Sequence, residues 1–360
     1  MDEANITSEH PGRYLLKNEH ARGAIGRIVL ARDRHLGREI AVKELLSPGS
    51  RISGAQATPG RLTSETRARF LREARITGQL EHPSIVPVYE LGQRPDGTIF
   101  YTMRLVRGKS LADLLRECQT LFDRLQLLPH FIDVCHAMAY AHSKGVIHRD
   151  LKPHNVVVGE FGETIVLDWG LAKMRGGADL GGPRSDLPDL DGVCADGTVP
   201  GRPMGTPSYM SPEQAEGRLE EVDEKSDVWG LGAMLYEILT GRPPYTGTSA
   251  MEVICRVVTD EVRPASVVEP EAPPELCEIV HRCLRKRREE RYPNATELAE
   301  VVAQVLLGLF GPVSFIRVRA ERNLAVEQKL AIEEQRKVAE EQRRIAEEQR
   351  SLARQAEEEA

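Results

Sequence analysis

Cysteine pairs, long hydrophobic runs and an excess of positive charge are all missing from this sequence. Its six cysteines are scattered without a C-x-x-C pair, which excludes a disulfide framework and a zinc site and favours a reduced protein. The most apolar stretch, Val301–Phe310, is too short for a bilayer-spanning helix, which needs about 20 residues. The polar N-terminus has no secretory signal. We therefore expect a cytoplasmic protein, tethered to a membrane only if the chain is part of a longer one.

The charge and the composition indicate a folded, soluble protein. Lys and Arg number 48 while Asp and Glu number 55, so the net charge of −7 gives no basis for binding nucleic acid. Hydrophobic residues make up 41% of the chain and charged residues 29%, which excludes a disordered or fibrous protein. A length of 360 residues predicts about two domains.

The hydrophobic pattern divides the chain into a strand-rich part and a helical part. Between Tyr14 and Val106 one helical stretch, Ser64–Leu80, interrupts short strand-like runs, which are Arg27–Ala31, Glu39–Leu45, Ile85–Leu91 and Thr98–Leu105. From Ser110 to Leu309 the apolar residues recur at helical spacing. Two Gly- and Pro-rich segments, Ser47–Thr63 and Arg175–Pro203, are expected to be a flexible insertion and a mobile loop.

The C-terminal region has a different pattern. Glu321–Gln355 contains no Gly or Pro and repeats every seven residues, with one apolar row at Leu324, Ala331, Val338, Ile345 and Leu352. Glutamines occupy the positions where a coiled coil would place its second apolar row. We expect a solvated single helix held by Glu–Arg pairs one turn apart, and the alternative is a weak self-associating coiled coil.

A glycine-containing turn and a lysine in an apolar strand are the first signs of phosphate chemistry. Gly23 and Gly26 lie between two strand-like runs, where glycine lets backbone N–H groups approach phosphate oxygens, although a plain hairpin turn gives the same pattern. Lys43 ends the apolar run Ile40–Lys43, and a lysine is rarely buried without a partner. It is either a snorkelling edge lysine or a cation placed for phosphate, with Glu73 as its partner.

The stronger sign is a polar loop over residues 148–155, which reads HRDLKPHN. Thirteen residues after Asn155 comes Asp168, in the triplet DWG that follows the strand-like run Thr164–Leu167. Carboxylate and amide oxygens are the ligands that Mg²⁺ prefers, and substrate phosphates can complete its coordination. Asp150 is then left to orient and deprotonate a hydroxyl group.

These motifs, in this order, resemble those of the protein kinase family over Tyr14–Leu309. Further marks are Ser211-Pro212-Glu213, Asp227 and Arg291, and the resemblance implies that Asp227 braces the catalytic loop while Arg291 pairs with Glu213. The implied fold is α+β and bilobal. It comprises a flexible N-terminus at 1–13, a kinase domain at 14–309 and a charged helical tail at 310–360. The lobes would be a β-rich N-lobe at 14–106 and a helical C-lobe at 107–309.

The resemblance also implies ATP and Mg²⁺ as cofactors and assigns a role to each site residue. Asp150 would be the catalytic base, Lys152 would steady the transferred phosphate, and Asn155 and Asp168 would hold the metal. The nucleotide would contact the glycine loop, the Lys43–Glu73 pair, the adenine pocket and the linker, through Ala21, Arg22, Gly23, Gly26, Ile28, Ala41, Lys43, Glu73, Met103, Leu105, Val157 and Asp168. Met103 would be the gatekeeper.

Three positions depart from the family pattern. Ala21 stands for the first glycine of the loop, and Trp169 stands for the phenylalanine of the DFG triplet. Thr77, four residues after Glu73, replaces an aliphatic residue and brings the tightness of the active packing into question. The ligand Asp168 itself is intact.

The most similar branch of the family is that of the bacterial, eukaryotic-like serine/threonine kinases, because of Lys152 and the GTPSY run at 205–209. We expect ATP- and Mg²⁺-dependent transfer of the γ-phosphate to serine and threonine hydroxyls of protein substrates, in signalling. The alternatives are a nucleotide-binding pseudokinase and a scaffold that acts through its helical tail. A pseudokinase predicts the loss of Lys43, Asp150 or Asp168, and all three are present.

Arg149 predicts a further regulatory feature. In the resembled family an arginine at this place pairs with a phosphorylated residue of the activation segment. We therefore expect autophosphorylation within Arg175–Thr206, with Thr198 favoured over Ser185. The alternative is that this acidic segment is a passive tether.

Overall fold

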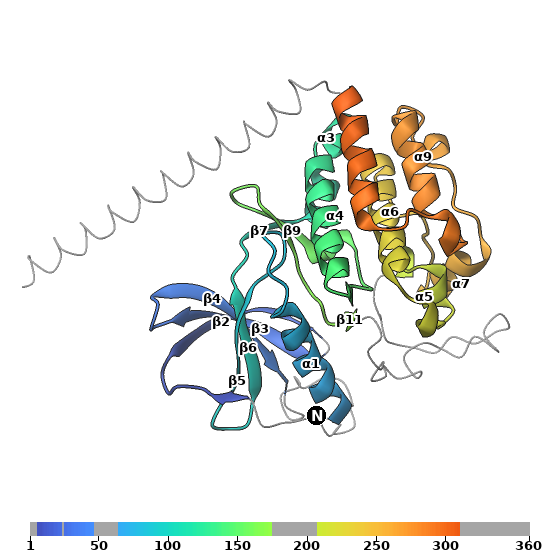
Figure 1. Cartoon of the computed structure of the whole chain (residues 1–360). Helices are drawn as coiled ribbons and strands as arrows, with labels where there is room; N and C mark the ends of the chain where they lie inside the picture. Colours follow the sequence, from blue (N-terminus) through green and yellow to red (C-terminus); the bar gives the residue numbers. More distant parts are fainter. Residues whose placement is uncertain (1–5, 24, 47–63, 175–206, 310–360) are drawn as a thin grey trace, which may run out of the picture.

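The computed structural model describes residues 6–23, 25–46, 64–174 and 207–309. The insertion expected at 47–63, the autophosphorylation sites expected within 175–206 and the charged tail expected at 310–360 lie outside the described residues. The described part consists of a β-rich half followed in sequence by a helical half (Figure 1).

The N-terminal half is built on a six-stranded sheet in the order β1-β5-β6-β4-β3-β2. Its strands are β1 (Thr7–Ser8), β2 (Tyr14–Arg22), β3 (Gly26–Asp33), β4 (Arg38–Leu45), β5 (Val88–Gln93) and β6 (Ile99–Arg104). All neighbours are antiparallel except β1 and β5. Strand β4 therefore lies inside the sheet, where Lys43 faces Ile28 of β3 on one side and Tyr101 of β6 on the other.

The predicted strand at Ile85–Leu91 is wrong at its start. Strand β5 begins at Val88, and Ile85 makes only an isolated bridge to Val166. Pro87 lies directly before β5 and has no N–H group to donate to a ladder, so regular pairing begins after it.

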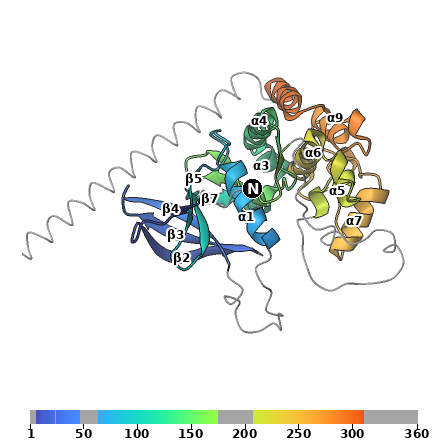
Figure 2. The same cartoon turned by 60° about the horizontal axis from the view of Figure 1, so that its bottom comes forward.

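Helix α1 (Ser64–Thr77) lies on the side of the sheet that faces the helical half, as both views show (Figures 1 and 2). It ends before the predicted Leu80, because after Gly78 the N–H groups of Gln79 and Leu80 donate to carbonyls only three residues back and form a tighter turn. Its apolar face packs on the sheet in a cluster that contains Leu45, Phe70, Leu71, Ala74, Ile99 and Tyr101.

The C-terminal half is mainly helical. Its helices are α2 (Leu111–Glu117), α3 (Leu121–Leu125), α4 (Leu128–Ser143), α5 (Pro212–Ala215), α6 (Glu224–Thr240), α7 (Ala250–Thr259), α8 (Ala265–Val268), α9 (Pro274–Cys283) and a further helix over 295–309. Short strands pair between them, namely β7 (Gly108–Ser110), β8 (Val146–Ile147), β9 (Val156–Gly159), β10 (Thr164–Val166) and β11 (Lys173–Met174). No helix within the described ranges is both long enough and apolar enough to cross a membrane.

Helix α6 forms the centre of this half. Asp223 caps its N-terminus by accepting a hydrogen bond from the N–H group of Lys225 at 2.8 Å, and Gly241 ends it in the left-handed conformation, with φ of 72°. Between these caps nearly every side chain is buried, including Trp229 and Tyr236. The helix carries Asp227 in its first turn, next to the polar loop at 148–155. The predicted α+β fold, with a β-rich lobe before a helical lobe, is confirmed.

Candidate active site

The Lys43–Glu73 pair connects the sheet to helix α1. Lys43 Nζ lies 2.5 Å from Glu73 Oε1, and the Glu73 side chain is 2% exposed. Because β4 is flanked by β3 and β6, the alternative of a snorkelling edge lysine is wrong. The Lys43 ammonium group is therefore held at a fixed place between the sheet and helix α1.

Tyr101 is a member of this cluster that the sequence analysis did not identify. Its hydroxyl group donates a hydrogen bond to Glu73 Oε1 at 2.7 Å. Burial, together with the negative charge of Glu73, raises the pKa of Tyr101 well above its ordinary value, so the phenol keeps its proton. The second carboxylate oxygen, Glu73 Oε2, is buried without a hydrogen-bond partner among the described residues.

The polar loop at 148–155 brings its three predicted catalytic side chains together. Lys152 Nζ lies 2.6 Å from Asp150 Oδ2, and Asn155 Nδ2 donates to the Asp150 carbonyl at 2.9 Å and to Asp150 Oδ2 at 3.2 Å. The N–H group of Leu167 donates to the Asn155 carbonyl at 2.7 Å. This bond ties the loop to the segment that leads into Asp168.

The Asp168 side chain lies close to that of Lys43. Its backbone is left-handed, with φ of 58°, which is unusual for a residue other than glycine and is typical of functional sites. Asp168 Oδ1 lies 3.9 Å from Lys43 Nζ, and the Asp168 side chain is 52% exposed. Next to it the ring of Trp169 is buried, with its centroid 4.6 Å from that of His148. The larger ring is therefore accommodated, and it anchors one side of the strained turn.

Asp227 braces the polar loop, as the resemblance to the protein kinases implied. Its two carboxylate oxygens accept hydrogen bonds from the N–H groups of His148, at 2.8 Å, and Arg149, at 2.9 Å. His142 Nε2 lies 2.8 Å from the same carboxylate. Burial alone would raise the pKa of Asp227, but its contacts with His142 and His148 hold that pKa below its ordinary value. The ionised carboxylate thus fixes Arg149, whose φ is 71°, directly before Asp150.

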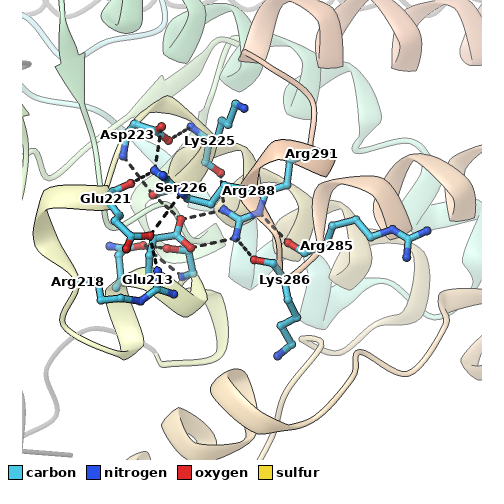
Figure 3. Close-up of polar contacts among 12 residues, drawn as sticks. Glu213, Arg218, Glu221, Asp223, Lys225, Ser226, Arg285, Lys286, Arg288 and Arg291 are labelled. Atoms are coloured by element: carbon cyan, nitrogen blue, oxygen red, sulfur yellow. Dashed lines mark hydrogen bonds and ion pairs between the residues drawn. The ribbon is translucent and has the colours of Figure 1, made fainter.

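The predicted Glu213–Arg291 pair is also confirmed (Figure 3). Arg291 Nη1 and Nη2 donate to the two oxygens of Glu213 at 2.8 Å and 3.0 Å, and both side chains are at most 1% exposed. Arg291 also donates to the backbone carbonyls of Lys225, Arg285 and Lys286. Burial would raise the pKa of Glu213, but the bonds from Arg291 hold it below its ordinary value. The pair joins the start of α5 to the segment after α9.

The predicted glycine loop is a turn between β2 and β3. Ala21 lies opposite Ile28, and the N–H group of Gly23 donates to the Gly26 carbonyl at 2.8 Å. A Cβ atom on Gly26 would lie 2.8 Å from the carbonyl oxygen of Glu44, so this glycine is also required by packing. The Arg22 side chain pairs with Glu19 at the surface. Residue 24, at the tip of the turn, is outside the described residues.

The residues predicted for the adenine pocket lie around the linker between the two halves. Ala41 of β4 faces Met103 of β6 across the sheet, and Leu105 follows directly in the linker. Val157 lies on β9, which pairs with β7 just after the linker. These residues thus come from strands on both sides of the linker in the chain.

Thr77 is accommodated without an unsatisfied polar group. It is 3% exposed, and its hydroxyl group donates to the Glu73 carbonyl at 2.8 Å. Hydrogen bonding to the preceding turn is a common way to bury a threonine in a helix. The substitution therefore leaves Glu73 in contact with Lys43.

A sequence model of the protein kinase domain matches residues 16–303. The chain belongs to the protein kinase family. The resemblance inferred from its motifs is confirmed, and members of this family use ATP and a divalent metal ion and act on protein substrates.

Three curated relatives with similar sequences are bacterial kinases. The chain is 34% identical over 314 residues to the serine/threonine-protein kinase PknD of Chlamydia trachomatis serovar D, an alignment that covers 82% of this chain and 32% of that protein. It is 32% identical over 308 residues to PknD of Protochlamydia amoebophila, with 82% and 30% covered. It is also 34% identical over 290 residues to a probable serine/threonine-protein kinase of Streptomyces coelicolor, with 80% and 39% covered. The alignments with these relatives span about a third of their length.

Proposed function

We propose that this kinase domain transfers the γ-phosphate of ATP to serine and threonine hydroxyl groups of proteins. The observation that carries the proposal is the convergence of Lys43 and Asp168, whose charged atoms lie 3.9 Å apart, in a chain whose loop at 148–155 is complete. Phosphoryl transfer needs positioning and charge stabilisation more than covalent chemistry. The side chains of this site can provide both.

Lys43 and Glu73 act together in nucleotide binding. Lys43 binds phosphate oxygens of the nucleotide, and Glu73 keeps the ammonium group from swinging away. The glycine turn at Gly23 and Gly26 covers the phosphates through its backbone N–H groups. The adenine ring lies between Ala41 and Val157 beside the linker.

Asp150 is the general base, and its neighbours fix its direction. Oδ2 accepts from both Lys152 and Asn155, so the carboxylate cannot rotate freely and Oδ1 is left for the substrate hydroxyl. Lys152, held next to this oxygen, also steadies the phosphate during transfer.

Asp168 and Asn155 fit a magnesium ion. Asp168 offers a half-exposed carboxylate beside Lys43, and Asn155 uses its amide nitrogen for Asp150, which leaves the amide oxygen for a metal. These are hard oxygen donors, as Mg²⁺ prefers. When bound, the ion neutralises charge that develops on the phosphate oxygens.

Three further assignments complete the proposal. The lobes meet in the linker after β6, which gives an N-lobe at 14–106 and a C-lobe at 107–309. The domain acts on the cytoplasmic side, where ATP is supplied. The chain self-associates through its tail, a proposal for which the heptad pattern of the sequence is the sole support.

The pseudokinase alternative has no support, because Lys43, Asp150 and Asp168 are present and the curated relatives are named as kinases.

Incubation of the full chain with ATP, Mg²⁺ and a generic basic protein tests the function. We expect phosphate on serine or threonine of the added protein, and none on tyrosine, by mass spectrometry. A Lys43→Met variant serves as the negative control. Nucleotide binding without transfer to any hydroxyl would instead establish a pseudokinase.

A further inference from the structure

Tyr101 occupies a special place in the N-terminal sheet. It lies on β6 directly opposite Lys43 of β4, two residues before Met103, and it is 4% exposed. Its side chain therefore leaves the sheet beside the ammonium group, on the face that helix α1 covers. Lys43 Nζ lies 5.8 Å from the centre of the Tyr101 ring.

Tyr101 contacts helix α1 at two points. Its hydroxyl group donates to Glu73 Oε1 at 2.7 Å, and its ring lies 5.3 Å from that of Phe70, centre to centre. Phe70 and Glu73 are three residues apart and therefore share one face of the helix. The Tyr101 side chain thus contacts both the apolar Phe70 and the charged Glu73 on this face of the helix.

The hydrogen bond from Tyr101 matters because the buried Glu73 carboxylate has few other partners. Oε1 accepts from both Lys43 and Tyr101, whereas Oε2 is buried and has no partner among the described residues. A buried carboxylate is costly unless it is paired and hydrogen-bonded. Without the phenol, Lys43 alone would offset the burial of Glu73, so a position of α1 that exposes Glu73 to water would become more populated.

We propose that Tyr101 is a positioning residue, which holds α1 against the sheet so that Glu73 stays paired with Lys43. The proposal rests on the proposed function, since the Lys43–Glu73 pair is assigned to phosphate binding. The protein exists in two states, paired and unpaired, and ATP binds the paired state. Tyr101 shifts this equilibrium toward the paired state from within the N-lobe itself.

The test is Tyr101→Phe, which removes the hydroxyl group and keeps the ring on Phe70. A hydrogen bond to a charged group contributes enough to change such an equilibrium by about tenfold or more. Because apparent affinity falls with the competent fraction, we expect the KM for ATP to rise about three- to tenfold. Saturating ATP restores the paired state, so kcat should stay within about twofold of wild type.

Tyr14→Phe is the matched control. Tyr14 is also a buried N-lobe tyrosine, its hydroxyl group donates to Glu90, and its ring lies 5.9 Å from that of Phe100. It belongs to a separate apolar cluster, which contains neither Tyr101 nor Phe70. Both variants lose one buried phenol bond and should lose comparable thermal stability, but only Tyr101→Phe should change the KM for ATP.

A double-mutant cycle tests whether Tyr101 acts through Glu73. In a Glu73→Ala background, Tyr101→Phe should leave ATP affinity unchanged, as measured by calorimetry. An equal loss of affinity in both backgrounds, or a Tyr101→Phe variant with the KM of wild type, would overturn the proposal. Calorimetry needs no turnover, so wild type that binds ATP without transferring phosphate would refute the proposed function and leave this test intact.

Discussion

Asp150→Asn is expected to lower phosphoryl transfer by about 10²- to 10⁴-fold, the usual contribution of a positioned general base. The substitution is nearly isosteric, so Lys152 and Asn155 keep their places around residue 150. The KM for ATP should change little, because Lys43 and Asp168, the residues proposed to hold the nucleotide and its metal ion, are unchanged. Steady-state transfer to a protein substrate, with ATP varied, measures both quantities.

A control for this variant is Asp260→Asn, which changes an exposed aspartate at the end of α7 in the same way. Its turnover should equal that of wild type. If Asp150→Asn transferred phosphate at a near-normal rate, Asp150 would not be the base, and its contact with Lys152 would have only a structural role.

The largest expected effect on stability comes from Arg291→Ala. Arg291 is fully buried, and its removal would leave three backbone carbonyls without this donor and the Glu213 carboxylate with only the hydrogen bond from the Ser226 hydroxyl group. Breaking a buried ion pair by removing one partner costs about 3–5 kcal/mol. The free energy of unfolding should fall by this amount, as measured by denaturant titration of the full chain.

Arg287→Ala is the comparison for this effect. Arg287 pairs with Glu290 at 3.6 Å, with side chains that are 77% and 45% exposed. Exposed pairs of this kind contribute little to stability, so this variant should unfold like wild type. Equal unfolding curves for Arg291→Ala and wild type would show that the Glu213–Arg291 pair does not hold the helical half together.

The contacts among the candidate catalytic residues could be predicted from the sequence, because these residues are close together along the chain. Asp150, Lys152 and Asn155 lie within one short loop, and Asp168 follows one hairpin later. Local spacing therefore places them within reach of one another once the hairpin β9–β10 forms. The partners Asp227 and Arg291 are far away in sequence, and only the resemblance to a family assigned them.

Tyr101 could not be found in this way. Its role depends on the register between β4 and β6, which places it opposite Lys43, and on the position of α1 over the sheet. Neither follows from a linear pattern, since an apolar strand with an aromatic residue is ordinary. One feature of the sequence did point to Tyr101. It lies two residues before Met103, in a strand already predicted to border the nucleotide.

Element ends were also poorly predicted where backbone chemistry competes with side-chain pattern. The apolar residues at 85–91 favour one strand, but Pro87 removes a donor and delays pairing to Val88. The pattern of α1 continues to Leu80, whereas Gly78 ends the helix. Hydrophobic spacing reports which face is buried and does not report where the hydrogen-bond ladder stops.

In the proposed mechanism Asp150 is the general base and Asp168 is a ligand of the metal ion. Calorimetric titration of ATP into wild type, Asp150→Asn and Asp168→Ala, with and without Mg²⁺, tests it most directly. We expect Mg²⁺ to strengthen ATP binding to wild type and to Asp150→Asn, and this gain in affinity to be lost in Asp168→Ala. A full Mg²⁺-dependent gain in Asp168→Ala, or its loss in Asp150→Asn, would contradict the assignment.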